Sequence, residues 1–196
     1  MSAFIQFISQ TPTTVLSIKA AKQQLKIEVD DDFDNDIIQD CIDAAVEEAE
    51  NYINASIYQR EYAIKCSEWL KNNYEIRKQK ITAVKSITYK DVSGEDQALV
   101  VEDVVELQEI DKYVTVINYL DEANLPELIT NKADAVVINI TVGYQAGKVP
   151  KGMLQGIKLL MTENYNIRNN IESKGYRSTA LRKLEPYKYY TKPLEQ

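Results

Sequence analysis

Apolar residues recur at steps of three and four between residues 37 and 53. This spacing places them on one face of a helix, so the segment is predicted to form an amphipathic helix of roughly four to five turns. A shorter helix is predicted to begin at Ser17, whose hydroxyl can cap it, and to end near Lys26. The acidic run at residues 30–36 then lies at the N-terminus of the long helix, where the helix dipole favours negative charge.

After Arg60 the pattern changes to the two-residue alternation of a strand. The clearest such segment is residues 81–89, which precedes a turn at Ser93 and Gly94. Residues 62–68 alternate less regularly, and residues 99–105, 113–118 and 135–144 are predicted as further strands because they are rich in Val, Ile and Thr. Pro126 and polar neighbours predict a loop at 121–134.

A last helix is predicted after Val149 and Pro150, because proline suits the first helical turn. Its apolar face consists of Met153, Leu154, Ile157, Leu160, Met161 and Tyr165. The helical period fails after Ile171, and no regular period is present in residues 1–15.

The order of elements predicts an α+β fold, with helices packed on a small antiparallel sheet, a long C-terminal helix and extended terminal tails. By position, the chain divides into an N-terminal arm (1–15), a main domain (16–171) and a C-terminal tail (172–196).

Composition narrows the possible chemistry. The 196 residues carry a formal charge of −7 and include no histidine, so the commonest general base and metal ligand is missing. An acidic surface does not grip nucleic acid through phosphate neutralisation. The two cysteines form no C-x-x-C pair, which fits a reducing compartment, and no apolar run is long enough to span a membrane. We therefore expect a soluble protein made in a cytoplasm, with no membrane partner and no cofactor.

Individual motifs give no catalytic or metal site. The acidic run DDDFDND has alternating aspartates but lacks the glycine and the final glutamate of a calcium loop. The carboxylates of Glu47, Glu48 and Glu50 fall on the polar face of the long helix, where solvation is the ordinary role. We expect Cys41 and Cys66 to pack in the core, because neither has an activating histidine.

Several segments, in their order and spacing, resemble a known family. VLSIKAAKQQLKI, an acidic loop and NDIIQDCIDAAVEEAENYI are similar to the N-terminal helical pair of phage head-tail connector proteins. ITAVKSITYKD resembles their central strand, and VVINITVGYQAGKVPKGMLQGIKLLMTENYNIR their last strand, Gly turn and C-terminal helix. STALRKLEPYKYY resembles a tail that carries a Leu-x-Pro-Tyr element. The chain departs from the family at residues 69–80, which lack a proline-rich segment, and at 94–134, which are long and acidic.

The resemblance implies a structural, non-enzymatic role at the head-tail junction of a virion made in a bacterial host. Such subunits form a ring, usually dodecameric, beneath the portal protein, extend the DNA channel and provide a platform for a stopper or tail-completion protein. An acidic ring, with a charge of roughly −84 for twelve copies, lets DNA pass without specific binding. Acidic surfaces also serve solubility alone, so charge is consistent with the role without establishing it.

Two sets of residues are candidates for contacts with other subunits. A ring needs two different, complementary surfaces on each copy. The broad apolar stripe of the long helix offers one candidate, whose residues are Ile37, Ile38, Cys41 and Ile42, although a wide stripe facing the protein's own core is the favoured alternative. The tail offers the other, a portal-docking segment with Leu181, Leu184, Pro186, Tyr187, Tyr189 and Tyr190, and here the alternative is that the tail wraps its own domain.

Two other classes of function remain open at this point. A cytosolic binding module or enzyme of unknown substrate would need a pocket with clustered ionisable groups. A nucleic-acid binder that stacks bases on the aromatic tail would show steeply salt-dependent affinity.

Overall fold

The computed structural model describes residues 3–11, 14–71, 74–75, 81–111, 114–121, 124–169 and 175–189. The chain forms two compact units, and each is built from segments distant in sequence. The first unit combines Met1–Pro12 with Tyr58–Gly143, and the second combines Thr13–Ile57 with Tyr144–Gln196. This grouping differs from the division into arm, domain and tail by sequence position, because the N-terminal segment pairs with a strand that begins some fifty residues later.

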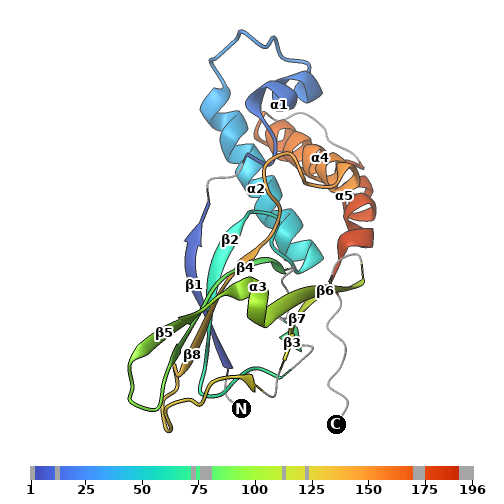
Figure 1. Cartoon of the computed structure of the whole chain (residues 1–196). Helices are drawn as coiled ribbons and strands as arrows, with labels where there is room; N and C mark the ends of the chain where they lie inside the picture. Colours follow the sequence, from blue (N-terminus) through green and yellow to red (C-terminus); the bar gives the residue numbers. More distant parts are fainter. Residues whose placement is uncertain are drawn as a thin grey trace. The chain divides into compact units, whose positions relative to one another are not determined.

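The first unit contains two antiparallel sheets (Figure 1). Within the described residues, one sheet has five strands in the order β1 (Ala3–Gln10), β2 (Arg60–Cys66), β8 (Val136–Val142), β4 (Ile81–Lys90) and β5 (Asp96–Leu99). The other has three, in the order β3 (Tyr74–Glu75), β7 (Val114–Tyr119) and β6 (Val105–Asp111), and α3 (Val101–Val104) links β5 to β6. All strand pairs are antiparallel.

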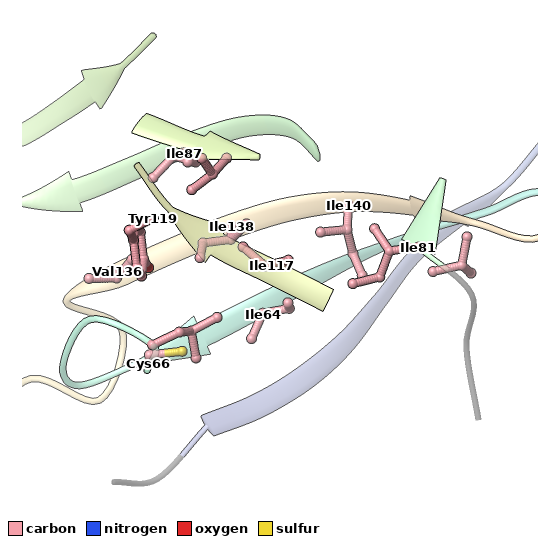
Figure 2. Packing of buried hydrophobic residues seen from close by; sticks show 12 residues of the cluster. Ile64, Cys66, Ile81, Ile87, Ile117, Tyr119, Val136, Ile138 and Ile140 are labelled. Atoms are coloured by element: carbon pink, nitrogen blue, oxygen red, sulfur yellow. The ribbon is translucent and has the colours of Figure 1, made fainter. Parts of the chain in front are cut away.

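The core of the first unit lies on one face of the larger sheet (Figure 2). Ile138 of β8 pairs with Ile64 of β2 on one side and with Ile87 of β4 on the other, and all three are fully buried. Ile117 and Tyr119 of β7 contribute to the same cluster. Strand β8 lies at the centre of this sheet, between β2 and β4, and five of its seven residues are buried.

The second unit is helical. Its elements are α1 (Ile18–Leu25), α2 (Asn35–Ile53), α4 (Lys151–Arg168), α5 (Tyr176–Leu184) and the 3-10 turn η2 (Glu185–Tyr187). Ser17 caps α1 by accepting a hydrogen bond from the Ala20 amide at 3.2 Å, and Lys26 ends it in the left-handed conformation. Both boundaries agree with the prediction.

The α+β class, the antiparallel sheet and the long C-terminal helix are confirmed. Four strand predictions, the loop before β8 and the turn at Ser93 and Gly94 also agree with the structure. The strand expected at 99–105 is wrong: β5 ends at Leu99, and the next residues form α3 before β6 begins. Val100 and Val101 resemble a strand in composition, but Val100 is exposed and only Val101 packs on the core.

Segments near both ends of the chain form regular secondary structure that the sequence did not predict. Residues 3–10, expected to be an arm, form strand β1. In the tail, 176–184 form α5, so the prediction of an extended segment there is wrong. Ala180 and Leu184 are fully buried one helical turn apart, and a Cβ on Gly156 of α4 would lie 2.8 Å from Leu184 Cγ. A glycine on the partner helix thus lets a narrow apolar stripe of α5 pack closely.

Candidate functional site: contact surfaces

The predicted interface residues of α2 lie mainly inside the second unit. Ile38 and Ile42 are buried, Cys41 is almost so, and Ile37 is half-buried. This burial favours the core-facing alternative for the first three, because a buried side chain reaches a second subunit only if its own unit opens. An interface role remains a prediction with surface to support it only at Ile37.

A buried lysine anchors the acidic loop before α2 through hydrogen bonds. Lys22 of α1 is 2% exposed, and its ammonium donates to the Val29 carbonyl at 2.9 Å and to Asp32 Oδ1 at 3.2 Å. Asn35 donates to the same Asp32 oxygen, and these contacts hold the pKa of Asp32 below its usual range. On the other side, Tyr165 of α4 donates to Asp34 at 2.7 Å.

Phe33 stands out of this loop with 91% of its surface exposed. Its amide donates to Asp31 Oδ1 at 3.1 Å, so the backbone that carries the ring is itself hydrogen-bonded. The sequence did not predict a role for Phe33, because the aspartates on both sides of it have the spacing of a cation-binding loop. The sequence feature that could have revealed it is a large apolar residue at a position outside any helical or strand period.

The predicted docking residues of the tail divide into inner and outer groups. Leu184 is buried, Leu181 is half-buried, and Tyr187 lies against Gly152 of α4. Tyr189 donates its amide to the Ile53 carbonyl at 2.7 Å. Pro186 is exposed, and Tyr190 lies outside the described residues. The tail therefore wraps its own unit in part, as one of the two alternatives held, while docking on a portal remains a prediction for its outer face.

Basic residues make up much of that outer face. Arg182 and Lys183 in the last turn of α5 are exposed. Arg177 contacts Glu48 of α2. The Lys188 ammonium lies 4.6 Å from the centre of the Tyr52 ring, and the Tyr52 hydroxyl donates a hydrogen bond to Glu185. We define the outer face of α5 as Arg182 and Lys183 of that helix together with Pro186 of the following turn η2. Arg182 and Lys183 give this face a local positive charge, although the net charge of the chain is −7.

Strand β1 forms an exposed apolar edge of the larger sheet. Phe4, Ile5, Phe7 and Ile8 are 40–59% exposed, although Phe7 packs edge-on against Tyr62 of β2 at 5.7 Å. No charged residue occurs before Lys19. Natural edge strands are commonly protected by charge or proline, and β1 has neither.

The hairpin between β4 and β5 is held by one carboxylate. Asp91 Oδ1 accepts hydrogen bonds from the Ser93 amide, the Ser93 hydroxyl and the Glu95 amide at 2.5–3.1 Å, and Oδ2 accepts one from Gln97 at 3.0 Å. The side-chain bonds from Ser93 and Gln97 lower the pKa of Asp91 to about 2. The charged form is therefore the one that the folded turn prefers.

This preference predicts a pH dependence of the hairpin. A lowered pKa stabilises the fold at pH values above the ordinary 3.8, and that contribution is lost as the pH falls toward 2. We expect the Asp91 carboxyl to titrate near pH 2 in NMR spectra, whereas an unperturbed aspartate titrates at about pH 4. In Asp91→Ala the Ser93 and Glu95 amides should exchange faster with solvent. An Asp91 midpoint near 3.8 would contradict this account.

Both cysteine side chains, Cys41 and Cys66, pack in the interior of the protein. Cys66 is fully buried and Cys41 is 8% exposed. Burial raises the pKa of the Cys66 thiol to about 11 and raises that of Cys41 as well. A thiol with a raised pKa is a poor nucleophile at neutral pH.

Among the described residues, no three metal-ligating side chains come together, and no helix has the length and apolarity needed to cross a membrane.

Comparison with known proteins identifies the family. A model of the family "Phage gp6-like head-tail connector protein" matches residues 16–113, and the chain belongs to this family. The matched segment includes α1, α2, strands β2 to β6 and α3, but not β1. A comparison with curated protein sequences gave no match.

Solved structures with the same fold come from gene transfer agent (GTA) particles. The chain is similar to a protein in the neck of an empty GTA particle computed with C6 symmetry, at 15% identity and a TM-score of 0.73, covering 97% of this chain and 98% of the other. A chain from the native GTA virion matches at 18% identity and a TM-score of 0.71, with 97% of each chain covered. A chain from the native GTA neck computed with C12 symmetry matches at 16% identity and a TM-score of 0.67, with 97% and 98% covered.

Proposed function

We propose that this chain is a structural subunit of the head-tail junction, where copies form a ring beneath the portal of a phage or phage-like particle. The ring extends the DNA channel and receives the stopper or tail-completion protein. The observation that carries the proposal is the family match together with a fold shared over almost the whole length with neck proteins of GTA particles. The role needs no catalytic step.

The charge of the chain supports passage of DNA over binding. A net charge of −7 on each copy gives an acidic ring, which repels the phosphate backbone at short range. The acidic loop around Phe33 and the basic outer face of α5 lie on different elements of the second unit. Different charges at different places suit a subunit that meets several partners, because complementary potentials select the partner and orientation.

Two-charge reversal on α5 should weaken binding to the portal. Arg182→Glu with Lys183→Glu changes exposed side chains at the outer face of α5 and leaves the buried Ala180 and Leu184 in place. We expect about ten-fold weaker binding to the portal ring at low salt, and a smaller difference at high salt. Co-sedimentation of the purified chain with portal rings from the same particle measures this.

The matched control reverses two exposed lysines of the same unit, Lys19→Glu with Lys26→Glu. Equal loss of binding in both variants would mean that net charge, and not the outer face of α5, controls docking. Absence of any binding or ring on the portal by the unmodified chain, judged by electron microscopy, would contradict the proposed function itself. Deletion of residues 176–190 is a poorer test, because it also uncovers the core beneath Leu184.

A further inference from the structure

The larger sheet of the first unit has two edges at which backbone groups of the described strands have no neighbouring strand. At one edge, β1 pairs with β2 and has no strand on its other side within the described residues. At the opposite edge, β5 covers only Ile87–Lys90 of β4. No described strand pairs with the outer side of β4 from Ile81 to Ser86. Among the residues that the structure describes, each copy therefore carries two different open edges of comparable length on one sheet.

We propose that β1 of one copy adds to β4 of the next copy, along Ile81–Ser86, so that the sheet continues from subunit to subunit. This inference rests on the proposed ring. A closed ring above two-fold symmetry is built from head-to-tail contacts between two unlike surfaces, and the two open edges are such a pair. A backbone edge recognises an extended strand through its amides and carbonyls, as in strand addition generally.

Strand directions fit this pairing. Each neighbouring pair in the order β1, β2, β8, β4 is antiparallel, so β1 and β4 run in opposite directions within a copy. A twelve-fold rotation turns any direction by no more than about 30° between adjacent copies. Adjacent strands in a sheet are themselves twisted by roughly 20–25°. The incoming β1 would therefore meet β4 as an antiparallel neighbour with an ordinary twist.

The side chains also match. Ile5 pairs with Ile64 and Phe7 with Tyr62, which places both on the face that carries the core. Val84 of β4 pairs with Ile140 and lies on the same face, half-buried. Pairing of the two edges brings Ile5 and Phe7 of one copy to Val84 of the next. The exposed apolar surface of β1, without a single charge, then becomes buried in the assembly.

Disulfide trapping tests the contact directly. In one copy β1 and β4 are separated by β2 and β8, which is about 14 Å at the usual strand spacing, whereas disulfide Cα atoms lie within about 7 Å. A disulfide between them therefore joins two copies. Gln6→Cys is combined in turn with Thr82→Cys, Ala83→Cys or Lys85→Cys, three positions along the open edge of β4. The native Cys41 and Cys66 are buried, so the unmodified chain is the background control.

We expect at least one double variant, assembled on the portal and oxidised, to give a ladder of covalent species beyond the dimer. Phe4→Lys with Ile8→Lys, two exposed positions, should reduce the assembled fraction ten-fold or more while circular dichroism stays that of the folded chain. Rings visible by microscopy with no cross-link in all three double variants would overturn the sheet contact and leave the proposed function intact. Cross-linked dimers from Gln6→Cys alone would overturn it in favour of β1 pairing with β1. A chain that forms no ring with the portal at all overturns the ring and the sheet contact together.

Discussion

Gly143→Ala is expected to cost the folded chain about 3–5 kcal/mol, one of the largest losses from a single added methyl group. Gly143 follows β8 with a φ of +81°, a conformation that disfavours any Cβ. An ideal Cβ there would lie 2.0 Å from the Tyr58 carbonyl oxygen and 2.7 Å from its carbon. Both neighbours are backbone atoms beside the Arg60–Val142 pair, so neither can rotate away. Urea unfolding followed by circular dichroism measures the loss, and thermal unfolding should shift by roughly 10 °C.

Gly147→Ala is the matched control. Gly147 also has a positive φ, +74°, but nothing lies within 4 Å of the added Cβ. We expect only the conformational cost, about 1 kcal/mol. Equal effects at the two positions would show that backbone conformation alone accounts for the loss at Gly143, and that the close approach to Tyr58 relaxes without cost.

The elements that could be predicted from the sequence are those whose pattern is local. Helix α2 has a long apolar period, and α1 has a serine cap at its start. Strand β8 is rich in Val, Ile and Thr, which favour strands. In each case the residues that determine the element lie within it, so no knowledge of distant contacts was needed.

The elements that were missed depend on partners elsewhere in the chain. In β1, Phe4 and Ile5 are adjacent, as are Phe7 and Ile8, so no alternation is visible until pairing with β2 is known. Helix α5 buries only Ala180 and Leu184, and it packs against α4 where Gly156 leaves space. Neither the pairing of β1 with β2 nor the packing of α5 on α4 can be read from the residues of that element alone.

The role of the candidate contact residues also depends on partners elsewhere in the chain. A large apolar side chain in a tail suits a partner's groove and the protein's own core equally well. Leu184 was predicted to dock on the portal, and it lies against Gly156. Phe33 had no such prediction, and it is the most exposed of the large apolar side chains described. Burial, which decides between the two roles, depends on the assembled fold.

Leu184→Ala should therefore act on stability more than on partner binding. The side chain is fully buried between α5 and α4, and removal of a buried leucine to alanine leaves a cavity that costs about 2–5 kcal/mol. We expect the helical unit to unfold at lower urea concentration, while the folded fraction binds the portal as the unmodified chain does. Unfolding is measured by circular dichroism and binding by co-sedimentation well below the unfolding transition.

Pro186→Ala separates the two roles, because Pro186 is exposed just beyond α5 and belongs to its outer face. If the buried and exposed residues of the tail serve different purposes, Pro186→Ala should leave stability within about 0.5 kcal/mol and weaken docking. The opposite pattern, with binding lost in Leu184→Ala at unchanged stability, would mean that α5 leaves α4 when the subunit joins the particle. The two variants together decide whether α5 is a fixed part of the helical unit or a segment released for a partner.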